Sequence, residues 1–415
     1  MTKSKFRRLT AVLLGAAALT LTAPAYALFG EKPVTPPVVP KALDEATKSA
    51  LAKEFLLLNF AKAGARLVVV GEYGHVLLSD DNGKSWRQAK SVPTKSTLTS
   101  VVFVDEKNGW AAGHDTIVLH TNDGGETWVR QNGGGDNDDA LLTIVFMDAQ
   151  RGLAMGAFNY TIETADGGKT WTKRKLAADD AKAAPAPSAA PAAPANPAAG
   201  PTEDELQAKA DAEAEAKAKA SGVDGAYAVA EGDDAHINHA FAGPNGMVMV
   251  AAEAGKIYRS TDNGKTFQRI QTQYPGSFWG GAFLTDGSIV VVGMRGNIWR
   301  STDQGLTWTK SDTGKADQSI ASVIQLPDGD VVAVGLSGGL LVSKDGGKTF
   351  AVKFRDDRKG LNSVISSPDG RIFIAGEAGL HDVTDEVKAM PAAVPTAKAP
   401  AAPAANPSAP AAAPR

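Results

Sequence analysis

The sequence predicts an all-β fold, a seven-bladed β-propeller with a low-complexity insertion and tail. Three observations lead to this prediction. An eight-residue box of the form Ser-x-Asp-x-Gly-x-Thr-Trp occurs six times, a small residue precedes each box by eight positions, and strand-forming residues alternate with turn residues throughout. Short strands between turns at a period of about 40 to 50 residues are typical of propeller blades.

The boxes set the repeat length. Their aspartates are 41 to 43 residues apart except for one interval of 96, which is one repeat plus an insertion of about 54 residues. The box aspartates are Asp81, Asp123, Asp166, Asp262, Asp303 and Asp345. The small residues are Gly71, Gly113, Gly156, Ala252, Gly293 and Gly335. A seventh unit has the corresponding residue, Gly376, and similar strand-forming residues, but it lacks the box.

Each unit is predicted to hold four short strands. In the second unit these are 98–104, 109–113, 117–120 and 128–131, with Gly, Asn or Asp at the bends. Stacking seven such sheets around an axis buries both faces of each. The seventh unit has no obvious fourth strand; residues 31–50 are a candidate, although four prolines limit strand length there.

The two ends and the insertion differ from the repeats. Basic residues, an apolar run over 9–21 and Ala25-Tyr26-Ala27 predict a signal peptide over 1–27, cleaved after Ala27, and hence a periplasmic protein. The apolar run is shorter than the roughly 20 residues of a membrane span. We then expect a linker and possible closing segment over 28–54, the propeller over 55–390, an Ala/Pro-rich and charged helical insertion over 176–222, and a disordered Ala/Pro-rich tail over 391–415.

Charge and cysteine content narrow the class of protein. The chain has no cysteine, which excludes disulfides and a conventional lipoprotein anchor. Cleavage would remove four basic residues and leave 39 basic against 46 acidic, a net charge of −7. This balance argues against a nucleic-acid partner and for a soluble exported protein, which we expect to be monomeric.

We interpret the repeated box as scaffolding. Its aspartate could serve metal binding or acid catalysis, but six dispersed copies cannot converge on one substrate. The carboxylate can instead accept backbone N–H groups of its own turn, and the aromatic ring can fill space between sheets. The box resembles the Asp box, or BNR repeat, of sialidases and related propellers. That resemblance implies that the boxes lie opposite the functional face.

The other face is therefore the candidate partner-binding face. It carries the turns between second and third strands and the connections between blades, where residues differ from blade to blade and acidic and basic groups separate across the ring. Ordinary solubility charge is the alternative interpretation. The candidate residues are Glu72, Tyr73, His114, Asp115, Asp136, Asp138, Asp139, Asp233, Asp234, Arg295, Arg355 and Arg358.

The sequence gives little support for a catalytic site or a metal site. A sialidase-like enzyme needs an arginine cluster and a tyrosine with acidic partners, and Tyr73 with Glu72 is the only close pair of that kind in a candidate turn. The acidic loops lack an EF-hand pattern, and His236 and His239 straddle a strand. We predict no catalytic residue, no cofactor and no metal.

A closer resemblance is to the photosystem II stability and assembly factor family and its non-photosynthetic bacterial relatives. It covers about 55–384 and rests on strings such as NGWAAGHDTIVLHTNDGGETW and GSIVVVGMRGNIWRSTDQGLTW. The resemblance implies a non-catalytic propeller that binds a membrane protein complex or transporter and supports its assembly or operation; a resistance-nodulation-division (RND) export system is one hypothesis. A glycan-binding or sialidase-like propeller is the alternative.

Overall fold

The computed structural model describes residues 44–133, 139–176, 235–314 and 316–394, all within the compact unit Leu43–Arg415. The predicted signal peptide, nearly all of the insertion and nearly all of the tail lie outside these residues. No helix in the described part has both the length and the apolar character needed to cross a membrane.

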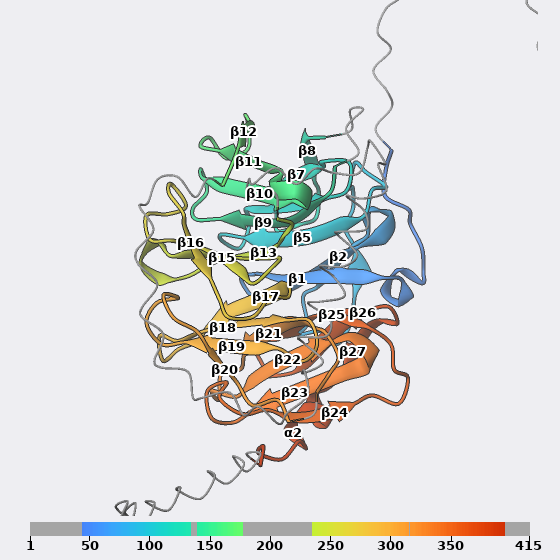
Figure 1. Cartoon of the computed structure of the whole chain (residues 1–415). Helices are drawn as coiled ribbons and strands as arrows, with labels where there is room; N and C mark the ends of the chain where they lie inside the picture. Colours follow the sequence, from blue (N-terminus) through green and yellow to red (C-terminus); the bar gives the residue numbers. More distant parts are fainter. Residues whose placement is uncertain (1–43, 134–138, 177–234, 315, 395–415) are drawn as a thin grey trace, which may run out of the picture. The chain divides into compact units, whose positions relative to one another are not determined.

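The described residues form seven antiparallel sheets whose strands follow one another in sequence order (Figure 1). The first strands are β1 (Leu57–Ala63), β5 (Leu98–Phe103), β9 (Leu141–Phe146), β13 (Ile237–Ala242), β17 (Phe278–Phe283), β21 (Ile320–Gln325) and β25 (Leu361–Ser366). The second strands are β2 (Arg66–Gly71), β6 (Gly109–Gly113), β10 (Gly152–Gly156), β14 (Val248–Ala252), β18 (Ile289–Gly293), β22 (Val331–Gly335) and β26 (Ile372–Gly376).

The outer half of each sheet is shorter. The third strands are β3 (Val76–Ser79), β7 (Val118–Thr121), β11 (Thr161–Thr164), β15 (Lys256–Ser260), β19 (Ile298–Ser301), β23 (Gly339–Ser343) and β27 (Gly379–Asp382). The fourth strands are β4 (Arg87–Gln88), β8 (Val129–Asn132), β12 (Thr172–Arg174), β16 (Gln268–Gln271), β20 (Thr309–Lys310) and β24 (Ala351–Phe354). The seventh sheet has three described strands and is followed by α2 (Thr384–Lys388).

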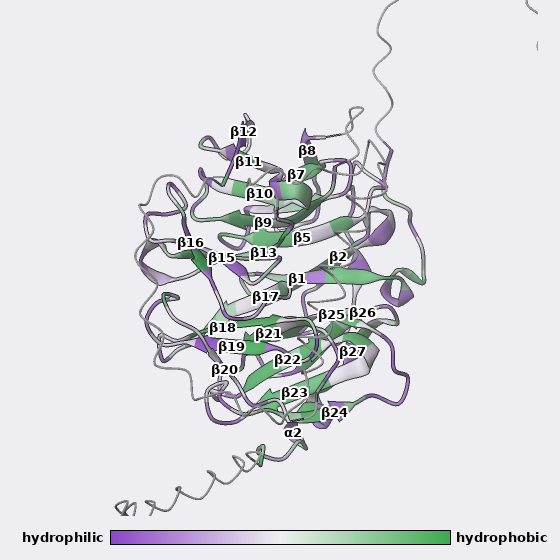
Figure 2. Cartoon of the chain, in the orientation of Figure 1, coloured by the Kyte–Doolittle hydropathy of each residue, from purple (hydrophilic) through white to green (hydrophobic). Residues whose placement is uncertain are grey.

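The sheets close into a ring. Each first strand contacts the first strands of both neighbouring blades, and β25 contacts β1, so the cycle is complete. The second strands are almost entirely buried, and they are hydrophobic along their length (Figure 2). One apolar cluster fills each of the seven junctions between blades, including the junction between blades seven and one. The predicted seven-bladed propeller is confirmed.

A bulge at the start of every first strand explains the small residue before each box. The pairing with the second strand shifts by one residue there, for instance between Leu57 and Asn59 opposite Gly71. The Gly71 backbone then lies so close to Leu56 that a Cβ would come within 2.2 Å of its carbonyl oxygen. The extra residue of each bulge, such as Leu58, is directed to the ring axis, which is how bulges commonly re-aim a side chain.

In the described part of the chain the seventh blade has no fourth strand, and residues 31–43 of the segment that was a candidate to supply one lie outside it. The described part of that segment, 44–50, forms no strand and instead lies beside the first blade, where the Ala46 N–H donates to the Val92 oxygen (2.8 Å). At the junction between blades seven and one, the Ser363 hydroxyl accepts the Phe60 N–H (3.3 Å) and Phe373 packs in the same apolar cluster as Phe60. The helix α2 adds Val387 to the cluster between blades six and seven.

Three strands of the second blade differ from the prediction by one residue: the first ends at Phe103, and the third and fourth are each displaced by one position. The Ile117 N–H donates to the His114 oxygen and closes the turn, so the third strand is Val118–Thr121. Trp128 still belongs to the box, because its indole N–H donates to Gly125, and the fourth strand is Val129–Asn132.

Candidate partner-binding face

The Asp boxes form hydrogen-bonded loops that join third and fourth strands. In the box that follows β15, the Ser260 hydroxyl and the Thr266 N–H donate to Oδ1 of Asp262 (2.7 and 3.0 Å). The Thr266 hydroxyl donates to Oδ2 (2.7 Å), and the Gly264 N–H donates to the Ser260 oxygen (3.0 Å). The same four contacts recur in the other five boxes.

These contacts keep the box aspartates ionised. The Ser85 hydroxyl, followed by the Ser85 N–H, lowers the pKa of Asp81 to about 2, and the Thr170 groups lower the pKa of Asp166 to about 2 in the same way. A carboxylate that already accepts these donors is ill suited to act as a general acid near neutral pH.

Box carbonyls also tie each blade to the preceding one. Arg66 of the first blade donates to the Gly124 oxygen of the second blade's box (2.9 Å), and Arg300 of the fifth donates to Gly346 of the sixth (2.8 Å). Equivalent contacts from the second, third, fourth and seventh blades run from Gln131 to Gly167, Arg174 to Gly264, Arg259 to Gln304 and Arg371 to Asn82. The boxes therefore act in the scaffold.

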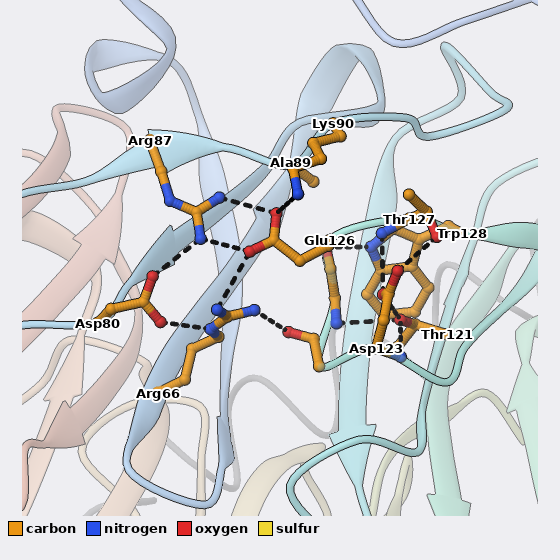
Figure 3. A network of polar contacts seen from close by, with 12 residues as sticks. Arg66, Asp80, Arg87, Ala89, Lys90, Thr121, Asp123, Glu126, Thr127 and Trp128 are labelled. Carbon is orange, nitrogen blue, oxygen red and sulfur yellow. Dashed lines mark hydrogen bonds and ion pairs between the residues drawn. The ribbon is translucent and has the colours of Figure 1, made fainter.

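Charged side chains complete this contact between the first two blades (Figure 3). Arg66 and Arg87 flank Asp80 at 2.5 and 2.8 Å, and both reach Glu126 of the next box at 3.1 and 2.5 Å. Lys90 also lies 3.6 Å from Glu126, so three cations face two carboxylates across the junction.

The opposite side of the ring carries the turns between second and third strands, each joined to a neighbouring blade connection. The Thr116 N–H donates to Asp139 (3.0 Å), the Gly296 N–H to Gln318 (2.8 Å) and the Arg355 N–H to Gly338 (2.9 Å). The structure thus places the described turns and connections together, on what we call the turn face.

Several turns hold bulky side chains in an unusual backbone conformation. Tyr73 has φ 56° and ψ 24°, Gly74 follows with φ 69°, and the His75 N–H donates to the Glu72 oxygen (3.0 Å), which is a type I′ turn. Phe158 occupies the same position in the third blade with φ 52°. Asn and Gly favour such positions, whereas a bulky residue there costs about 1–3 kcal/mol.

These side chains are also exposed. Tyr73 is 49% and Phe158 51% exposed, and Leu336 is exposed in the corresponding turn of the sixth blade. Tyr73 packs edge-on against Phe55 (ring centroids 5.6 Å apart), and Phe158 against His236 (4.5 Å). Phe55, Phe158 and Leu336 were not among the predicted residues; a large apolar residue in a turn was the signal that could have identified them.

Some predicted residues have structural contacts on this face. Glu72 Oε1 accepts the Leu56 N–H (2.9 Å), and Asp115 Oδ2 accepts the Ser96 hydroxyl (2.5 Å). Arg355 forms ion pairs with Asp357 and Glu386, each at 3.1 Å.

For the remaining predicted residues, the structure gives a position but does not test a role in binding. Arg358 lies over the Phe354 ring at 4.7 Å, His114 and Arg295 lie in their turns, and Asp139 lies in a blade connection. Asp136, Asp138, Asp233 and Asp234 lie outside the described residues. The contribution of the whole set to partner binding stays a prediction.

A small cavity of about 110 Å³ lies on the ring axis, and all seven first strands contribute to it. Its lining includes Asn59, Asn238, Asn362 and Trp279, and His239 is its one ionisable residue. Burial lowers the pKa of His239 to about 4, so the ring is neutral near pH 7. The lining thus offers neither the arginines nor the carboxylates of a sialidase site.

The histidines do not converge on a metal site. His236 contacts Phe158 in the turn of the third blade, whereas His239 lines the axial cavity. Across the described ranges, no three His, Cys, Asp or Glu side chains are grouped as a metal ion would require.

Comparison with known proteins gives three kinds of result. The family described as photosynthesis system II assembly factor YCF48 matches residues 41–134, which include the first two blades. No curated protein matches the sequence. Solved structures match over most of the chain.

Three of these structures have a TM-score of 0.53. "YCF48 bound to D1 peptide" is 16% identical, and the match covers 79% of this chain and 90% of that chain. YCF48 from Cyanidioschyzon merolae is 17% identical, with 79% and 94% covered. The WD40 β-propeller domain of Doa1 is 12% identical, with 82% and 94% covered.

The protein is thus a β-propeller whose blades are joined through Asp boxes. At such identities the structural matches establish the fold. The family match over residues 41–134 agrees with the predicted resemblance to the photosystem II assembly factor family. That the chain is not an enzyme stays a prediction.

Proposed function

We propose that this chain is an exported, non-catalytic propeller that binds a segment of a membrane protein complex on its turn face and supports the assembly or operation of that complex. The proposal rests on one observation: Tyr73 and Phe158 are exposed in turns whose backbone geometry disfavours them. Folding does not need these residues there, and such outliers cluster at binding sites.

The partner that suits this face is an extended peptide with apolar side chains. Tyrosine and phenylalanine lose little conformational entropy on binding and bury a large area, so they are frequent anchors of protein interfaces. The structure described as "YCF48 bound to D1 peptide" gives a precedent in which a similar propeller holds a peptide. We extend this peptide-binding role to the present chain.

The proposed location rests on the sequence. The signal-like N-terminus supports export to the periplasm, where a propeller could reach the exposed parts of an inner-membrane complex. An RND export system remains our hypothesis for that complex.

The test is cross-linked affinity purification of the mature protein, residues 28–415, from its native envelope. The parent would be compared with a Tyr73→Asn/Phe158→Asn double variant and with a Leu306→Asn control, because Leu306 is similarly exposed (45%) but lies in an Asp box. We expect one membrane complex to be recovered with the parent and the control and lost with the double variant.

Two other outcomes are informative. Equal recovery with all three proteins would reject the turn face as the binding surface. An additional variant with Asp136, Asp138, Asp139, Asp233 and Asp234 changed to Asn would then show whether the acidic connections bind the complex instead.

The glycosidase alternative gains no support from the described part of the chain. The carboxylate of Glu72 accepts the Leu56 N–H, so the one Tyr/acid pair of the candidate turns is committed to the backbone. Failure to recover any protein, together with binding on a glycan array, would revive this alternative.

A further inference from the structure

The Asp-box face has a cleft between blades five and six with an unusual charge balance. The cleft has a volume of about 220 Å³, and its lining includes Arg300, Lys310, Lys348, Thr302 and Thr309 but no carboxylate. One water occupies about 30 Å³ in the liquid, so the cleft has room for a small polyatomic ion with its hydration.

The junction between blades one and two carries acids at the corresponding positions. There, Asp80 at the second position of the box and Glu126 at the sixth position of the next box pair with Arg66 and Arg87. Between blades five and six the same two box positions hold Thr302 and Lys348, and lysine stands at the sixth position in four of the six boxes. The cleft therefore has a hydroxyl and a cation at positions where the first junction has two acids.

The basic side chains of the cleft are left available. Arg300 is held in place by Asp286 (2.7 Å) and by the Gly346 oxygen (2.8 Å), and its side chain is only 13% exposed. Its Nη1 group donates to no described residue. Lys310 and Lys348 form no ion pair with any acid in the described ranges.

Carboxylates close to the cleft are committed elsewhere. Asp303 and Asp345 accept the N–H and hydroxyl donors of their own box loops, and Asp286 pairs with Arg300. The charge that faces the opening is therefore positive. Because a buried or half-buried cation is stabilised by an anion, this arrangement selects for negatively charged ligands.

We propose that this cleft binds a phosphate group. Two lysines without an acidic partner, the Nη1 group of Arg300 and two threonine hydroxyls exceed what one carboxylate could use, whereas a phosphate offers several acceptor oxygens and up to two negative charges. Arg300 would orient the group, the two lysines would neutralise it, and Thr302 and Thr309 would donate hydrogen bonds. The ligand is either free phosphate or the phosphate of a lipid headgroup.

The test uses the mature chain and two probes. Inorganic phosphate would be titrated by isothermal calorimetry at low salt, and cosedimentation would be measured with phosphatidylglycerol vesicles and with phosphatidylcholine vesicles. The variant is Lys310→Gln/Lys348→Gln. The matched control is Lys169→Gln, because Lys169 holds in the third box the position that Lys348 holds in the sixth.

We expect saturable binding of phosphate, or of phosphatidylglycerol vesicles, that falls at least about tenfold in the double variant and less than about twofold in the control. Binding of phosphate alone would identify a free phosphate or phosphate ester as the ligand, and binding of the vesicles would identify a headgroup. The proposal is overturned if neither probe binds, or if the control loses as much affinity as the double variant.

Discussion

The two faces of the ring place different kinds of residue in the left-handed backbone conformation. Both use residues with positive φ, but the Asp-box face assigns these positions to Asn82, Asn263 and Gln304, each followed by glycine. On the turn face they include Tyr73 and Phe158, beside smaller or polar residues such as Ala254, Arg295 and Ser337. Asn adopts this conformation at low cost, whereas aromatic residues do not. The box face is therefore built for stability, and the turn face retains residues that stability alone would not select.

Exposure by itself would not have shown this difference. Val129 and Leu306 are exposed and apolar, and they lie in or beside the boxes. The conformation of the backbone separates the two faces, because scattered exposed apolar residues are normal on any protein surface.

Acidification should cause the largest loss of stability, because all six boxes respond together. The pKa values of Asp81, Asp166 and Asp262 are about 2 in the folded chain, below the ordinary value of 3.8. Such groups stabilise the fold fully above their ordinary pKa, and the contribution is lost as pH falls from about 4 toward 2. Thermal unfolding between pH 6 and pH 2 would measure this; an unchanged Tm down to pH 2 would contradict it.

Removal of one box carboxylate should have the next largest effect. Asp262→Ala leaves the donors of Ser260, Lys265 and Thr266 without their acceptor, and we expect a loss of about 3 kcal/mol in the free energy of unfolding. Urea titration would measure it. Asp356→Ala, an exposed residue in the connection between blades six and seven, is the control and should change stability by less than about 0.5 kcal/mol.

A smaller effect is expected from the ion pairs between blades one and two. Glu126→Gln removes the charge that Arg66 and Arg87 share and should cost about 1 kcal/mol at low salt. Salt screens exposed charges, so the difference between variant and parent should shrink in 1 M NaCl. A difference that is independent of salt would indicate that hydrogen-bond geometry, not charge, stabilises this junction.

The smallest effect on stability, and a large one on binding, is expected on the turn face. Tyr73→Asn places an Asn-Gly pair in a type I′ turn, which relieves backbone strain while it removes the packing against Phe55. We expect unfolding to change by no more than about 1 kcal/mol in either direction. Partner affinity, measured with the purified complex once it is recovered, should fall about tenfold or more.

The sequence was sufficient for the fold because the repeat is explicit in it. The spacing of the boxes set the number of blades, and their dispersal indicated scaffolding. The sequence could not explain the small residue before each box. A glycine such as Gly71 indicates that another part of the chain lies close to its backbone, but only the bulge at Leu57 shows that this part is the start of the first strand.

The candidate site was predictable only in part. Sequence position placed Glu72 and Asp115 correctly in their turns, but not their contacts with Leu56 and Ser96, which come from other parts of the chain. Phe158 follows the small residue of its repeat as Tyr73 does, but its backbone conformation and exposure come from the structure. Thr302 and Lys348 are visible in the repeats at the positions of Asp80 and Glu126, yet what those positions contact requires the distances in the first junction.

The contacts from one blade to the next box give the molecule a direction. In five of these six pairs the earlier blade supplies the donor, such as Arg66, and the later blade supplies the acceptor, such as Gly124. A blade is therefore completed by its successor in the sequence. The seam between Arg371 and Asn82 joins the last blade to the first, so the ring can form only when the final repeat has been made.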